Sequence, residues 1–140
     1  MPGAEGILAL DSSENLYYNW TKVFINYCDG SLHQGDNASP IPYKDTKLYF
    51  RGSRIVRSHF KYLINKYKMD EASKIIITGG SAGAVASFLW GNYLLSLVKN
   101  PSAVYNIPDS GIFINENTYQ SDVPLIEICI RTLMSIAHVT

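Results

Sequence analysis

A glycine-rich turn between two apolar runs constrains this chain more than any other feature. The turn, Gly79–Gly83 (GGSAG), matches the pattern Gly-x-Ser-x-Gly. It follows Ser73–Thr78, whose three consecutive isoleucines are typical of a parallel strand buried on both faces. It precedes Ala82–Lys99, which is apolar on most of its circumference, as expected of a helix buried on nearly all sides. The pattern therefore predicts a tight strand-to-helix connection that carries a serine.

Such a connection has a chemical use. A sharp turn lifts the hydroxyl of Ser81 off the end of the sheet, and small neighbours let the strand and the helix approach each other. The backbone N–H of Ala82 then lies at a helix N-terminus, where it can stabilise a developing oxyanion. Ser81 is thus the candidate catalytic nucleophile and Ala82 the candidate oxyanion-hole residue.

Phosphate-binding turns are the main alternative for a glycine-rich loop. A dinucleotide fingerprint needs glycine at its third and sixth positions, which are Ser81 and Ala84 here, and no acidic residue follows near position 100. No lysine follows the turn, so a Walker A loop is excluded. A turn that merely packs tightly stays open as an alternative.

A serine nucleophile needs a base and an acid, which in α/β-hydrolases follow it as Asp or Glu and then His. Asp109 and His138 offer that order. His138 would need a following loop and strand to hold it, so the alternative is that Asp109 ends a strand and His138 lies at a helix end. His33 and His59 precede the serine and are expected to be structural or solvated.

Apolar periodicity places the remaining elements. The alternation in Thr21–Tyr27 predicts a strand, and the polar composition of Ser31–Asp45 predicts a long surface loop. Ser53–Lys68 has the spacing of an amphipathic helix, Ser102–Ile107 reads as a short strand, and Val123–Ala137 as a last helix. Alternating helices and strands predict an α/β fold with a parallel sheet.

Composition excludes several classes of protein. Of the 140 residues, 46% are apolar, which is enough to bury a core and too many for a disordered tail. Basic and acidic residues balance at 12 each, which argues against nucleic-acid binding, because that function needs excess positive charge. The apolar stretch Ala84–Val98 is shorter than the roughly 20 residues that span a bilayer. We expect no nucleic-acid partner and no transmembrane segment.

Signals of compartment are weak. Met1–Leu10 lacks the basic start and the long apolar run of a signal peptide. Cys28 and Cys129 lack the close pairing of metal or redox motifs. Asn19-Trp20-Thr21 and Asn37-Ala38-Ser39 would accept N-linked sugars if the chain were secreted.

Several segments together resemble the pectin acetylesterase family, which also contains the Notum carboxylesterases. They arrive in family order and at family-like spacing over roughly residues 6 to 116. The segments are Gly6–Leu8, Tyr18–Trp20 with Val23, Tyr27–Gly30 (YCDG), Gly35–Asp36, Leu48–Ile55 (LYFRGSRI), Gly79–Ala84 and Asp109–Ile114.

The resemblance implies one partial domain over residues 1–140, with an α/β-hydrolase-like parallel sheet flanked by helices and incomplete at both ends. By position Ser81 matches the family nucleophile and Ala82 an oxyanion donor, while Asp109 does not match the catalytic acid. The family's acid and histidine lie beyond these residues, so the chain alone is expected to be weakly active or inactive. The family uses no metal and no cofactor.

The expected function is that of a serine carboxylesterase that deacetylates O-acetyl esters on a pectin-type polysaccharide or a related acyl substrate. The alternative is a catalytically inactive fragment or pseudoenzyme that acts as a binding or scaffold domain. A third possibility is a small complete esterase that uses Ser81, Asp109 and His138. Family members are mostly extracellular or in the secretory pathway, so the resemblance implies that location here.

Overall fold

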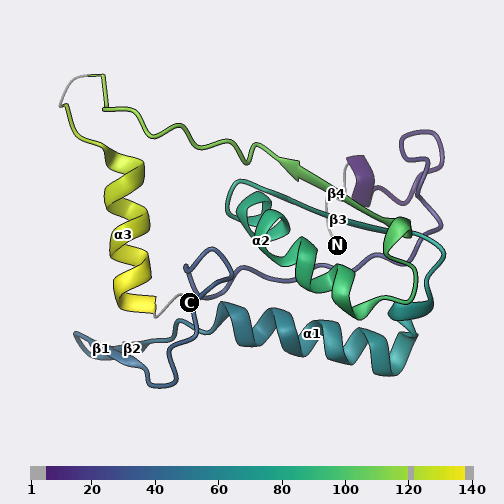
Figure 1. Ribbon diagram of the computed structural model, residues 1–140, viewed down its shortest axis with the longest axis horizontal. Helices are drawn as coiled ribbons and strands as arrows, with labels where there is room; N and C mark the ends of the chain where they lie inside the picture. The colour runs from purple at the N-terminus through teal and green to yellow at the C-terminus, as the bar shows by residue number, and fades with distance from the viewer. Residues whose placement is uncertain (1–5, 120–121, 138–140) are drawn as a thin grey trace.

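The computed structural model describes residues 6–119 and 122–137. Its centre is a strand–helix–strand unit made of β3 (Ile75–Gly80), α2 (Ala82–Leu97) and β4 (Val104–Asp109). The two strands pair in parallel, and α2 crosses between them and packs against both. Parallel neighbours need such a crossover connection. The predicted α/β class, with a parallel sheet and helices, is confirmed (Figure 1).

α1 (Gly52–Tyr67) confirms the helix predicted from apolar spacing, with a shift of one residue at each end. Its buried stripe includes Val56, Phe60 and Leu63, which recur at steps of four and three. The helix is capped by Lys68, which is left-handed and whose N–H donates to the carbonyls of Ile64 and Leu63 in the last turn.

The hydrophobic core lies between α1 and α2. Five buried side chains from these helices and the residue after α2 form one cluster: Val56, Phe60, Trp90, Leu94 and Val98. In Figure 1 the sheet, α2 and α1 follow one another as three layers. α2 therefore lies between the sheet and α1.

The strand predicted over Thr21–Tyr27 is wrong. This segment is extended but belongs to no sheet within the described parts of the chain. Val23 and Phe24 are exposed, whereas Ile25 packs against the core cluster. Alternation correctly marks one side chain that faces inward, but a strand also needs a hydrogen-bonded neighbour, which residues 6–119 and 122–137 do not supply.

The surface loop predicted over Ser31–Asp45 is wrong in its last part. β1 (Ile41–Tyr43) and β2 (Thr46–Leu48) form an antiparallel hairpin there. Lys44 takes the left-handed conformation, with φ 49°, in the two-residue turn. The usual Asn-Gly or Asp-Gly signal is missing from this turn, which explains why the sequence pattern hid it.

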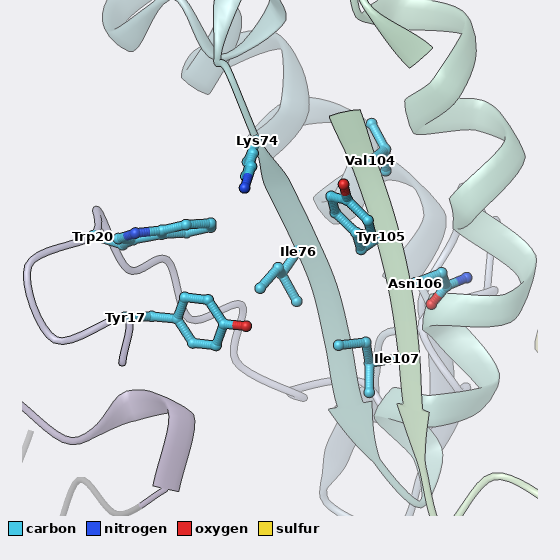
Figure 2. Close-up of a pocket in the computed structure, with 8 residues that line it drawn as sticks. All are labelled: Tyr17, Trp20, Lys74, Ile76, Val104, Tyr105, Asn106 and Ile107. Atoms are coloured by element: carbon cyan, nitrogen blue, oxygen red, sulfur yellow. The ribbon is translucent and has the colours of Figure 1, made fainter. Parts of the chain in front are cut away.

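Burial in the central unit is also lower than expected. β3 is half-buried rather than covered on both faces, and Phe88 and Leu89 of α2 are 54% and 57% exposed. The sheet face opposite α2 borders an open cavity of about 440 Å³ (Figure 2). The cavity is lined by Tyr17, Trp20, Lys74, Ile76, Val104, Tyr105, Asn106 and Ile107. The described sheet has two strands, too few to enclose an apolar helix and strand on all sides.

The last helix, α3 (Leu125–Ala137), begins two residues later than predicted. Figure 1 shows it at the end of an extended arm that leads away from β4. The backbone N–H of Asp36 donates to the carbonyl of Ala137 at 2.9 Å, which ties the end of α3 to the loop before the hairpin. Most apolar side chains of α3 are exposed.

Three short 3₁₀ helices complete the described structure: η1 (Gly6–Leu8), η2 (Met69–Glu71) and η3 (Pro101–Ala103). The strand predicted from residue 102 begins after η3, at Val104. Among the helices in the described ranges, none combines the length and the apolar character that crossing a membrane demands.

The loop that precedes the hairpin is fastened to α2. The indole N–H of Trp90 donates to the carbonyl of His33 at 3.0 Å, and both partners are buried. Leu32 and His33 are left-handed, with φ 53° and 60°, and the N–H of Leu32 donates to the hydroxyl of Tyr27. Non-glycine residues rarely take this conformation, so packing must hold the loop in place.

We expect stability to fall in acid because of His33. Burial lowers the pKa of this side chain below its usual value, against a smaller opposing effect of the Asp29 carboxylate. The unfolded chain then binds a proton more readily than the folded chain as the pH falls through about 6.5. The free energy of unfolding should therefore decrease from neutral to mildly acidic pH, as measured by urea denaturation.

His33→Asn is the matched variant, because asparagine tolerates a left-handed backbone and does not titrate. It should flatten this part of the pH dependence. An unchanged slope would show that His33 does not cause it.

Candidate active site

Ser81 occupies the turn between the end of β3 and the start of α2. Its backbone has φ 52° and ψ −110°, which a non-glycine residue adopts only under strain. Strain of this kind costs of order 1–3 kcal/mol and collects at functional sites. The side chain is exposed. The structure thus places Ser81 on the sharp strand-to-helix turn that the sequence pattern predicted.

Hydrogen bonds hold the strained residue on both sides. The N–H of Ser81 donates to the carbonyl of Asp109 at 3.1 Å, across the end of the parallel sheet. The carbonyl of Ser81 accepts from the N–H groups of Ala84 and Val85 at 3.0 and 3.2 Å. These bonds fix the serine between the neighbouring strand and the first turn of α2.

Glycine is required where the strand passes the helix. A Cβ atom on Gly79 would lie 2.6 Å from the backbone carbonyl of Gly83, closer than real Cβ atoms come to backbone. A Cβ on Gly111 would lie 2.7 Å from the Cβ of Ala84. The space beside Gly80, by contrast, is open. Gly79 and Gly111 therefore allow the close approach, whereas a larger residue would fit at Gly80.

Ala82 is the first residue of α2. The first N–H groups of a helix have no partner within the helix, and the helix dipole makes this end favourable for negative charge. Its N–H directly follows the serine in sequence, which is the position of an oxyanion donor in a nucleophile elbow. The local structure is compatible with the predicted role.

Asp109 lies at the same edge of the sheet as Ser81, opposite Gly80 in the register. Its carboxylate accepts a hydrogen bond from the Ser110 hydroxyl at 2.9 Å. The Ser81 hydroxyl itself has no hydrogen-bond partner among residues 6–119 and 122–137. His138 lies outside the described residues, so the serine, aspartate and histidine arrangement considered above stays untested.

The other histidines and the cysteines are placed elsewhere. His59 Nδ1 contacts the carbonyl of Ile55 at 2.8 Å, within α1, and His33 lies in the loop described above. Cys28 and Cys129 are both free and exposed. Within the described ranges, no three His, Cys, Asp or Glu side chains gather as they would around a metal ion.

A second group of residues, whose joint arrangement the sequence did not reveal, lies where the loop meets α1. The N–H of Gly35 donates to the Ser31 hydroxyl at 2.8 Å, and the carbonyl of Gly35 accepts from Ser53 N–H at 3.0 Å. A Cβ on Gly52 would lie 2.6 Å from the backbone of His33. The only signal in the sequence is the succession of short motifs. It shows their order along the chain but does not show which of them lie close together in space.

An ion pair closes the same junction. The guanidinium of Arg54 donates to the Asp36 carboxylate and to the carbonyl of that residue. This hydrogen bond lowers the pKa of Asp36 below its usual value. Both side chains are nearly half exposed, so the pair contributes orientation more than stability.

Replacing Gly79 by alanine should disrupt the turn. The new Cβ would meet backbone rather than a flexible side chain, so strand and helix must separate, which costs about 1–3 kcal/mol or more. Gly80→Ala is the matched control, because it adds the same methyl group one residue later in open space. Urea denaturation of both variants measures the difference, and equal stabilities would contradict the close contact.

Comparison with known proteins places this geometry in a family. The family model described as pectinacetylesterase matches residues 2–135. Pectin acetylesterase 11 of Arabidopsis thaliana is 37% identical over 114 residues, which cover 81% of this chain and 28% of that protein. Pectin acetylesterase 5 of the same plant is 35% identical over 112 residues, 79% of this chain and 26% of the relative.

The chain therefore spans about a quarter of the length of the curated relatives it matches. The match includes the strained serine turn, the two strands beside it and the loop fastened to α1 and α2. Since the family model covers nearly the whole sequence, the chain belongs to the pectinacetylesterase family.

Proposed function

We propose that these residues carry the nucleophile of a serine carboxylesterase that removes O-acetyl groups from a pectin-type polysaccharide. The observation that carries the proposal is the strained, exposed Ser81 between β3 and α2, in a chain of the pectinacetylesterase family. The relatives are named pectin acetylesterases, which supports acetylated pectin as the substrate. Ala82 supplies one N–H for the oxyanion.

The chemistry proceeds in two stages. A histidine takes the proton of the Ser81 hydroxyl while Oγ bonds to the ester carbonyl carbon, and the negative charge that develops on the carbonyl oxygen faces the Ala82 N–H. The bond to the sugar oxygen then breaks, and the sugar leaves with the proton from the histidine. Water attacks the acyl-enzyme in the same way, which releases acetate and restores the serine.

The strain at Ser81 has a role in this scheme. A serine in a regular strand would lie within the sheet, where an ester could not reach it. The backbone hydrogen bonds with Asp109, Ala84 and Val85 hold Ser81 out of the regular conformation, so its Cβ keeps one position through both stages. Fixed positioning of this kind lowers the entropic cost of attack.

The base and the acid come from residues outside those described. The free Ser81 hydroxyl supports this, since the described residues provide no acceptor for its proton. The Asp109 carboxylate is engaged by Ser110, so we assign the acid of the triad to another residue. We propose an extracellular or secretory location, in keeping with a polysaccharide substrate, and the mechanism needs no metal and no cofactor.

A binding or scaffold protein that keeps the fold without catalysis is the second candidate. The same free hydroxyl favours it, because a serine turn without a base does not react. The two candidates differ in what a serine substitution does to the intact protein. Only an esterase would release acetate more slowly after Ser81 is replaced.

Ser81→Ala in the intact protein should lower acetate release from acetylated pectin by at least about a thousandfold, because the acyl-enzyme no longer forms. Ser110→Ala is the matched control, since Ser110 also has a positive φ, of 54°, at the end of the neighbouring strand. The control should keep most of the activity. Acetate release under saturating substrate is the measurement.

Model esters such as p-nitrophenyl acetate react with many surface nucleophiles. Only the part of the rate that is lost in Ser81→Ala and kept in Ser110→Ala therefore counts as esterase activity. Equal activity in the wild type and Ser81→Ala would contradict the esterase assignment. No release above background from folded wild-type protein would favour the binding or scaffold candidate.

A further inference from the structure

The two N-linked sugar acceptors in the sequence lie in very different surroundings. Asn19 and Asn37 each begin a triplet of the form Asn-x-Ser/Thr. Asn19 lies in a turn before the extended segment, whereas Asn37 lies between the loop, the hairpin and α3. The triplets alone do not separate the two sites, but their contacts do.

Asn19 is available for modification. The side chain is exposed, as is that of Thr21, and within the described parts of the chain Asn19 has no hydrogen-bond partner. A backbone hydrogen bond closes the turn around it: the backbone N–H of Trp20 donates to the carbonyl of Tyr17 at 3.0 Å. A sugar attached here would break no hydrogen bond of Asn19 within the described residues.

The neighbouring rings face away from this turn. Tyr17 and Trp20 meet edge to face, with ring centroids 4.8 Å apart. Figure 2 shows both rings directed toward the sheet, beside the cavity. The aromatic pair therefore anchors the turn against the sheet, while Asn19 itself is exposed and leaves room for a sugar chain in solvent.

Asn37, in contrast, forms hydrogen bonds through both polar atoms of its side-chain amide. Its Oδ1 accepts from the Ser39 N–H at 3.1 Å, and its Nδ2 donates to the carbonyl of Ile136 at 3.4 Å. The backbone N–H donates to the carbonyl of Phe50 at 2.9 Å. A sugar on Nδ2 would compete for space with the last turn of α3, which Asn37 contacts through the carbonyl of Ile136.

We propose that Asn19 carries an N-linked oligosaccharide and that Asn37 does not. The inference rests on the proposed passage through the secretory pathway. The donor is an oligosaccharide linked to a lipid pyrophosphate. The amide nitrogen of Asn19 bonds to C1 of the first sugar, the bond from C1 to the pyrophosphate oxygen breaks, and the amide loses one proton.

Peptide mass spectrometry tests the assignment on the intact protein, expressed from its coding sequence in eukaryotic cells. A peptide-N-glycosidase in heavy-oxygen water converts each glycosylated asparagine into a labelled aspartate. We expect the label at Asn19 and none at Asn37. An unlabelled Asn19, a labelled Asn37, or a protein that never enters the secretory pathway would each overturn the inference.

Substitutions sharpen the test. Thr21→Val should abolish the sugar, because the acceptor needs a hydroxyl at this position, whereas Thr21→Ser should keep it. Asn37→Gln should leave the glycan mass unchanged, and Asn19→Gln should remove it. Retained sugar in Thr21→Val or Asn19→Gln would contradict the site.

The glycan and the esterase can fail separately. A secreted, active esterase with bare Asn19 would overturn this inference and leave the proposed function intact. A protein that is glycosylated at Asn19 but shows no rate dependent on Ser81 would contradict the proposed function alone. Asn19→Gln should keep the activity of the wild type, since Asn19 is exposed and forms no hydrogen bond with Ser81 or with any other residue in the described ranges.

Discussion

The close passage of Gly79 against Gly83 is the constraint on which the central unit depends. With a side chain at Gly79, the strand could not end so near to the helix that follows it. The strained backbone of Ser81 is the geometric consequence, because one residue must reverse the chain between β3 and α2. The neighbouring strand completes the arrangement through the carbonyl of Asp109. Backbone packing and a backbone hydrogen bond thus support one another at the serine.

A second junction connects this unit to the rest of the chain. Trp90, two turns into α2, bonds the loop at His33, and the same loop is fastened to the start of α1 through Gly52. Both helices therefore share one loop as well as one apolar cluster. Three of the family motifs that are separated in sequence, Tyr27–Gly30, Gly35–Asp36 and Leu48–Ile55, meet at this loop.

The sequence predicted the elements whose signals are local. The spacing in α1, the isoleucine run of β3 and the serine turn were all recognised, because side chains near one another in sequence produce these patterns. The hairpin was missed because Lys44 takes a left-handed turn position without the usual residues. Thr21–Tyr27 was misjudged as a strand because pairing depends on a partner that periodicity does not reveal. The close approach of Gly52 to the His33 backbone is likewise a tertiary contact, which no local pattern in the sequence predicts.

The attachment of α3 has a consequence for the order in which the chain assembles. The Asn37 amide and the carbonyl of Ile136 are 99 residues apart, so their contact closes a long loop. Loop closure costs entropy that only later contacts return, whereas β3, α2 and β4 are joined by short connections. The serine turn can therefore form from β3, α2 and β4 without the distant contact of α3.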